Sequence, residues 1–203
     1  MRKIALMFSF VLLLSSVCAF SQDQAPAPAF IDGDFWQFQM AIKSIGSSTK
    51  YIDDGIYELD YSQEKVKIFT IRNGQKTELD EGGRLLLRLL GLSRTRLNVK
   101  FPLSVGQKWN YDYKFQFPGS ITQNRSVEVN VVGIEQISTP AGTFRTFKLS
   151  SEGNWLQKGG RSSGFSKSIY FYSPETKSIV NENEEGEGLT RSIQLIKFGS
   201  VPN

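Results

Sequence analysis

The 203-residue chain contains no histidine and only one cysteine, Cys18. The lack of histidine removes the commonest general base, every Ser-His-Asp triad and the most frequent protein ligand of transition metals. Cys18 lies in an apolar leader, so the processed chain would have no disulfide, no thiolate nucleophile and no sulfur metal site. We therefore expect a non-enzymatic protein with no catalytic residue, no metal and no cofactor.

The chain also has only one long apolar run, which lies at the N-terminus. Residues 4–14 (IALMFSFVLLL) follow a basic start and are too few to span a bilayer comfortably. Small residues at positions 19 and 21 place signal-peptidase cleavage before Gln22. Residues 1–21 are thus predicted to be a signal peptide, and the mature chain to have no transmembrane segment.

Lipid attachment at Cys18 is not expected. It requires a Leu-type residue three positions before the cysteine and Gly or Ala directly before it, but Ser15 and Val17 stand there. Residues 22–30 are predicted to be a flexible tail. We expect an exported protein, periplasmic or extracellular.

The mature chain also has little net positive charge. The formal charge falls from +4 to +2 when Arg2 and Lys3 leave with the leader. No polybasic stripe occurs, so nucleic acid is not expected as a partner.

What the chain has in abundance is period-two alternation of apolar and polar residues, which is typical of β-strands. The predicted strands are 34–45, 55–61, 65–72, 75–79, 107–117, 125–138, 143–150, 164–173 and 188–198. Asn73-Gly74 suits a tight hairpin turn, and Gly133 a bulge. Nine or ten long strands must twist and coil. This predicts a single domain over 31–199, mainly β, with a strongly curved antiparallel sheet that forms a half-barrel or a closed barrel.

One segment breaks the β pattern. Residues 82–92 (GGRLLLRLLGL) are Leu-rich and predict one short helix that ends near Gly91. Arg84 and Arg88 would share one face of it. Such a helix could lie on a membrane surface; we expect instead that it plugs the sheet with its arginines outward.

The aromatic residues form a row in 105–117 (VGQKWNYDYKFQF), where every second residue from Trp109 to Phe117 is aromatic. A related opening, Gly-x-x-Trp-x-aromatic, occurs at 33–38 and 106–111, so both tryptophans are expected to point to one interior. We expect a concave face that holds a lipid or other apolar ligand, because tyrosine combines an apolar ring with a polar tip. The expected ligand-binding residues are Trp36, Phe38, Trp109, Tyr111 and Tyr113. The alternative is a dry aromatic core in a structural or protein-interaction module of the bacterial envelope.

Carboxylates and serines offer little further chemistry. Acidic residues cluster at 32–34, 53–54 and 182–187 (ENEEGE), in Gly-rich segments predicted to be solvated turns rather than a glycosidase pair. Ser162 and Ser163 are flanked by lysines, but a Gly/Ser-rich loop explains them without a Ser-Lys dyad.

Three segments carry a resemblance to a known family. They are 101–111 (FPLSVGQKWNY), 132–144 (VGIEQISTPAGTF) and 170–174 (YFYSP). The pattern resembles a family of exported bacterial β-rich proteins of unknown function with "PLxxGxxWxY … TPAGTF … YxSP". The resemblance covers roughly residues 101–180. It implies an envelope location and a curved antiparallel sheet, and it brings no catalytic residue.

Overall fold

The computed structural model describes residues 23–44, 50–79, 81–93, 95–116, 122–159, 162–186 and 188–201. The predicted signal peptide 1–21, Cys18 and Phe117 lie outside the described residues. The described elements are β1 (Gln24–Ala25), β2 (Asp34–Ser44), β3 (Lys50–Ser62), β4 (Lys65–Arg72), β5 (Gln75–Leu79), the 3-10 helix η1 (Glu81–Leu90), β6 (Leu103–Ser104), β7 (Lys108–Gln116), β8 (Thr122–Thr139), β9 (Gly142–Gln157), β10 (Ser163–Ser173), β11 (Ser178–Gly186) and β12 (Leu189–Ser200).

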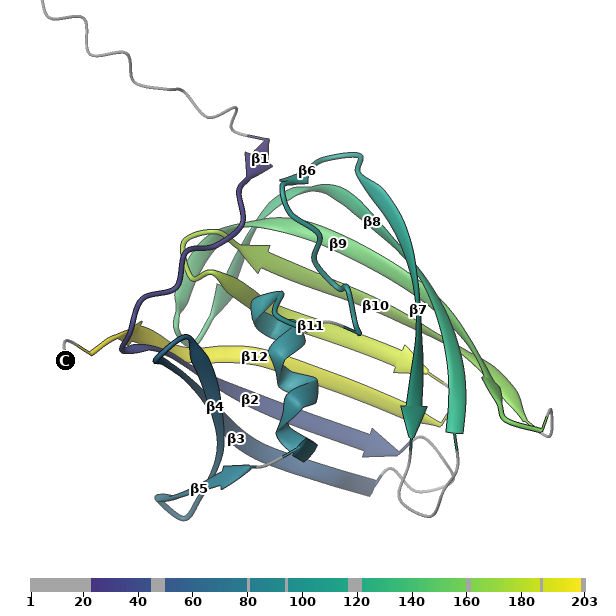
Figure 1. Ribbon diagram of the computed structural model, residues 1–203, viewed down its shortest axis with the longest axis horizontal. Helices are drawn as coiled ribbons and strands as arrows, with labels where there is room; N and C mark the ends of the chain where they lie inside the picture. Colours follow the sequence, from purple (N-terminus) through teal and green to yellow (C-terminus); the bar gives the residue numbers. More distant parts are fainter. Residues whose placement is uncertain are drawn as a thin grey trace, which may run out of the picture.

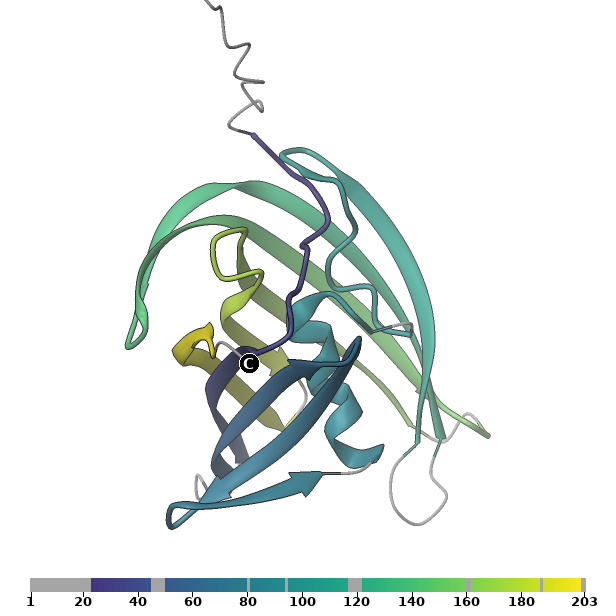
Figure 2. The same cartoon turned by 60° about the vertical axis from the view of Figure 1, so that its left-hand side comes forward.

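Ten of these strands form one antiparallel sheet, in the order β5-β4-β3-β2-β12-β11-β10-β9-β8-β7. The order contains two meanders, β2 to β5 and β7 to β12, which are joined where β2 pairs with β12. Figures 1 and 2 show the sheet curling deeply around one side. Because β5 and β7 are edge strands in this order, the sheet is open. The half-barrel alternative therefore describes it, and the closed barrel is wrong.

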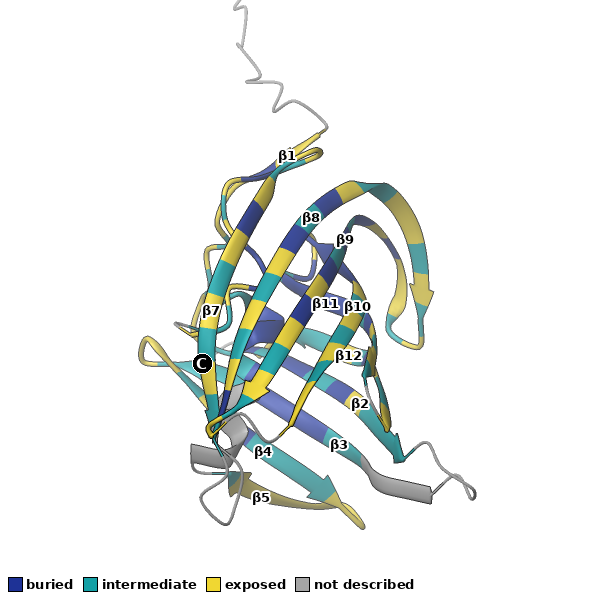
Figure 3. Cartoon of the chain, turned by 90° about the vertical axis from the view of Figure 1, so that its right-hand side faces the viewer, coloured by how far each residue is buried: buried dark blue, intermediate teal, exposed yellow. Residues whose placement is uncertain are grey.

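The strands follow the sequence pattern where apolar and polar residues alternate. Figure 3 shows exposed residues alternating with buried or intermediate ones along β7 and the first half of β8. Asn73 and Gly74 take positive φ (51° and 76°), as a tight hairpin turn requires. The pairing of β8 with β9 shifts register between Val131 and Gly133, which confirms a bulge at this point.

The Leu-rich segment is wound as the 3-10 helix η1 and not as an α-helix, which corrects the helix expected there. It lies against the concave side of the sheet (Figure 1). The tighter winding aligns residues three apart, and so stacks Leu86 on Leu89, both of which are buried. Gly91, at φ 71°, ends the helix, and the Leu92 N–H donates to the Leu87 carbonyl at 3.0 Å. No helix in the described ranges is long and apolar enough to cross a membrane.

The N-terminal segment from residue 23 packs against the rest of the domain, in the region where a flexible tail was expected over 22–30. β1 pairs with β6, and Ala25 is 1% exposed. Figure 1 shows this small sheet at the top of the molecule. Phe30 packs edge-on against Trp36, with ring centroids 5.5 Å apart. Apolar burial outweighs the polar character of this segment and extends the domain to residue 23.

Candidate ligand-binding site

The predicted aromatic site divides into a dry part and a polar part. Trp36, Phe38 and Trp109 are 2%, 0% and 7% exposed and belong to one core cluster. The Trp36 indole N–H donates to the Thr176 carbonyl at 2.6 Å. The Trp109 indole donates to the Leu97 carbonyl at the same distance. These three side chains, predicted to contact a ligand, are enclosed by protein and form part of the core.

Tyr111 and Tyr113 lie further along β7 and are only half-buried. Their rings stack with centroids 5.9 Å apart. The Tyr111 hydroxyl donates to Asn98 Oδ1 at 3.3 Å, and burial raises the pKa of this hydroxyl. Both tyrosines also border a hollow of about 710 Å³ along the edge of β7. The aromatic row therefore passes from the core at Trp109 to a polar lining at Tyr113.

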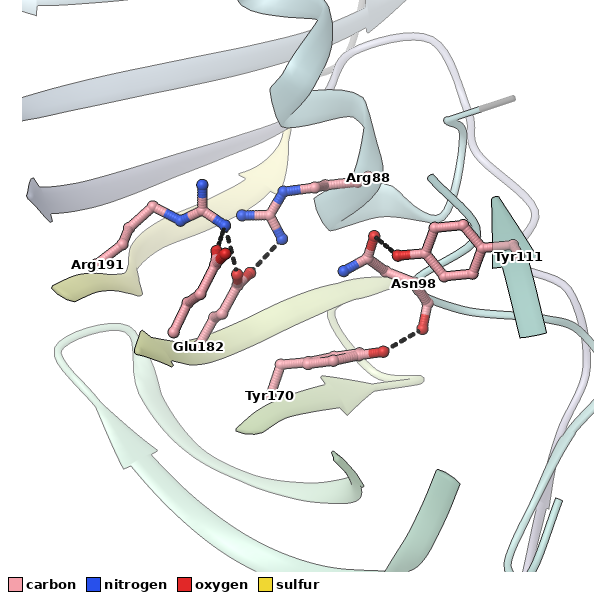
Figure 4. A network of polar contacts seen from close by, with 7 residues as sticks. Arg88, Asn98, Tyr111, Tyr170, Glu182 and Arg191 are labelled. Atoms are coloured by element: carbon pink, nitrogen blue, oxygen red, sulfur yellow. Dashed lines mark hydrogen bonds and ion pairs between the residues drawn. The ribbon is translucent and has the colours of Figure 1, made fainter. Parts of the chain in front are cut away.

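An ion-pair network occupies the concave face beside these tyrosines (Figure 4). Arg88 Nη1 donates to Glu182 Oε2, and these two side chains are 2% and 1% exposed. Arg191 Nη2 donates to Glu182 Oε1 at 3.0 Å and also to Glu184. Two expectations are overturned here. Arg88 points inward, and residues 182–186 belong to strand β11, with Glu182 in the interior.

The charges in this network fix the protonation of Glu182. Burial alone would raise the pKa of its carboxyl, but Arg88 and Arg191 outweigh burial and hold the pKa at about 2. The carboxylate is therefore charged at neutral pH. The two carboxylates in turn raise the pKa of Arg191 against the effect of burial. The two arginines and the two glutamates neutralise one another, as buried charges require, and within the described residues Arg191 Nε is left without a hydrogen-bond partner.

The sheet beneath the network is lined by small side chains. Strand register places Ser151 and Gly153 of β9 next to Ser168 and Ser166 of β10. All four border a small cavity of about 30 Å³, together with Arg88, Arg96, Arg191 and Glu182. The small side chains on these two adjoining strands leave space above the sheet, and the arginines occupy part of it.

A larger pocket of about 260 Å³ opens next to this cavity. Apart from Arg96, its lining residues come from the ends of β2, β7, β9 and β11 and from the beginnings of β8, β10 and β12. Figure 1 shows these strand ends on its right-hand side. We call this opening the mouth pocket. It is lined by Ile42, Arg96, Phe115, Gln123, Arg125, Trp155, Phe165, Ser166, Glu184, Gly186, Leu189 and Arg191.

The chemistry of the mouth pocket is mixed. Ile42, Phe115, Trp155 and Leu189 supply apolar surface, and Leu189 is 44% exposed. Arg96 and Arg125 supply positive charge. Such a combination of apolar walls with a few polar groups is typical of small-molecule sites, which often lie in the mouths of curved β-sheets.

The known proteins that match the chain resemble it in three-dimensional structure and not in overall sequence. No family model and no curated protein matches the chain. A candidate lipoprotein from Parabacteroides distasonis is 11% identical over 88% of this chain and all of its own, with a TM-score of 0.46. A candidate exported protein with a YmcC-like fold from Bacteroides fragilis is 14% identical over 88% and 99% of the two chains, with a TM-score of 0.39. The hypothetical lipoprotein YmcC from Escherichia coli is 13% identical over 83% and 86%, with a TM-score of 0.44.

Sequence reasoning missed the residues that make this site, because they look like surface residues. Arg96 stands in a polar loop, and Glu182 and Glu184 stand in an acidic run. One signal was present: Glu182 and Glu184 alternate with Asn181 and Asn183, which is the period of a strand with both faces polar. Within the described ranges, no group of three or more acidic, histidine or cysteine side chains is arranged to hold a metal ion.

Proposed function

We propose that the chain is an exported binding module that holds a lipid or other apolar ligand in the mouth pocket of its half-barrel. Export is supported by the signal-peptide pattern of residues 1–21. The observation that carries the binding proposal is the mouth pocket itself. Ile42, Phe115, Trp155 and Leu189 bring apolar surface from four different strands to one opening.

The same observation relocates the ligand from the residues first expected. The helix η1 and the core residues Trp36 and Phe38 fill one end of the concavity. At the other end, beyond the arginines that lie over the small side chains of β9 and β10, the mouth pocket of about 260 Å³ remains open. An apolar ligand would thus cover Phe115 and Trp155, and would reach the solvent past Leu189.

The test uses the mature chain from residue 22 and a neutral fluorescent probe, 1-N-phenylnaphthylamine, whose emission rises in apolar surroundings. We expect saturable uptake and a change in Trp155 fluorescence. Leu189→Gln should weaken uptake about tenfold, since it removes apolar contact at the opening. The matched control is Ile169→Gln: Ile169 is also 44% exposed, and it does not line the mouth pocket.

Two results would contradict the proposal. One is no saturable uptake by the folded protein, which would favour the alternative of a structural or protein-interaction module. The other is equal weakening by the two variants, which would mean that the probe binds to exposed apolar side chains at large.

A further inference from the structure

The described side chains around the site include more arginines than carboxylates. The guanidinium groups that border the mouth pocket and the small cavity behind it belong to Arg88, Arg96, Arg125 and Arg191. Among the described residues, the carboxylates that border them belong to Glu182 and Glu184. Both carboxylates are engaged by Arg88 and Arg191. In this set of described side chains, Arg96 and Arg125 therefore leave a surplus of two positive charges.

Arg96 is held in place by aromatic rings. Its guanidinium lies over the Tyr113 ring at 4.6 Å and over the Phe115 ring at 5.2 Å. Among the residues that the structure describes, no carboxylate forms an ion pair with it. Burial lowers the pKa of Arg96 to about 10, so the group remains protonated at neutral pH. A partly buried cation with aromatic contacts alone is costly unless something else compensates it.

Arg125 contacts the same two rings. Its guanidinium lies 5.4 Å from the Phe115 centroid and 6.0 Å from that of Tyr113. Its Nη2 and Nε donate to Gln123 Oε1 at 2.7 and 3.1 Å, a neutral acceptor that orients the group without cancelling its charge. Phe115 and Tyr113 thus hold two guanidinium groups at one wall of the mouth pocket.

We infer that Arg96 and Arg125 bind the anionic head group of the ligand, a carboxylate or a phosphate, whose apolar chain lies against Phe115, Trp155 and Leu189. Guanidinium groups donate paired hydrogen bonds that match these two anions, and they are more weakly hydrated than ammonium groups. The inference rests on the proposed function and narrows its ligand to an anionic amphiphile. A neutral or cationic amphiphile would leave the surplus charge uncompensated.

Competition against the bound neutral probe tests the head group separately from the apolar chain. The competitors are dodecanoate, dodecyl phosphate and dodecyltrimethylammonium, each below its micelle-forming concentration, dodecanol below its solubility limit, and inorganic phosphate. We expect the two anionic amphiphiles to compete at least tenfold more strongly than dodecanol. Arg96→Gln should weaken the two anions about ten- to a hundredfold and change dodecanol less than threefold.

The matched control is Arg72→Gln, which removes one positive charge from an exposed position of β4. It should leave the ranking of competitors unchanged. Arg125→Gln is a second variant of the site, for use if Arg96→Gln does not fold; it should weaken the same two anions.

Each contrary outcome has its own meaning. If dodecanol and dodecanoate compete equally, the head-group inference is overturned while the proposed function stands. If inorganic phosphate competes as well as dodecyl phosphate, the site is for a free anion and the inference is likewise overturned. If no probe enters at all, the proposed function itself fails.

Discussion

Replacement of Glu182 by glutamine probes the interior charge network most directly. The change keeps the size of the side chain and removes its charge, so Arg88 stays 2% exposed without an ionic partner. Glu182 accepts hydrogen bonds from two arginines. Hydrogen bonds to charged groups contribute about 1.5–3 kcal/mol each, and breaking a buried ion pair costs about 3–5 kcal/mol. We expect the free energy of unfolding to fall by about 3–5 kcal/mol.

Urea unfolding followed by tryptophan fluorescence measures this loss, because Trp36 and Trp109 are in the core. The matched control is Glu152→Gln. Glu152 pairs with Lys167 at 3.0 Å, but these side chains are 69% and 61% exposed. Solvent screening limits such a pair to about 1 kcal/mol or less. The two variants make the same chemical change, so the difference between their free energies of unfolding measures the effect of burying the ion pair.

The reasoning is refuted if Glu182→Gln costs no more than Glu152→Gln. A double variant, Arg88→Met with Glu182→Leu, adds a second check. It removes both buried charges and leaves apolar side chains in their place, while Arg191 keeps Glu184. It should recover most of the lost stability, since apolar replacement of a whole buried pair is often neutral or stabilising.

Two further predictions concern acid and backbone geometry. The pKa of Glu182 is held at about 2, below its ordinary 4.5, so the contribution of its charge to stability is complete above about pH 4.5 and disappears as the pH falls toward 2. Urea unfolding at stepped pH should show this loss of stability in the wild type but not in Glu182→Gln. Equal slopes of the free energy of unfolding against pH in the two proteins would contradict the assignment. Gly33 and Gly74 have φ of 93° and 76°, but only at Gly33 would an added Cβ meet another atom, the Val201 carbonyl oxygen at 2.0 Å. Gly33→Ala should therefore lower the thermal midpoint of unfolding clearly more than Gly74→Ala, which costs about 1 kcal/mol for backbone strain alone. Equal shifts of the midpoint would mean that the Val201 backbone moves aside freely.

The fold could be predicted where side-chain pattern and backbone geometry agree. The segments 65–72 and 75–79 match β4 and β5, because alternation brackets a turn whose residues Asn73 and Gly74 favour positive φ. Strand β11 was missed because such reasoning identifies strands by an apolar face. Its inward residues Glu182 and Glu184 are charged and find their partners on η1 and β12.

The site could be predicted less well, because its contacts depend on topology. Arg88 and Glu182 are 94 positions apart in the chain. An arginine among leucines is normally assigned to the solvent side of a helix, and an acidic run to a solvated turn. Each assignment was reasonable alone and both were wrong together, since the two charges neutralise each other inside. Without strand order there was no reason to consider them as a pair.

The concave face shows why the mouth pocket differs from core that is merely incomplete. One row across β8, β9 and β10, Val131, Leu149 and Tyr170, is large and buried. Two rows nearer the mouth, the same three strands carry Val127, Gly153 and Ser166. A sheet stabilised only by packing would repeat the large side chains there, and burying them would contribute roughly 1.5–3 kcal/mol each. On β9 and β10 the chain instead has Gly153 and Ser166, which border the small cavity together with Arg96, and no carboxylate among the described residues forms an ion pair with Arg96. Departures from stable packing that concentrate at one place are typical of functional sites, and here both departures, of volume and of charge, fall around Arg96.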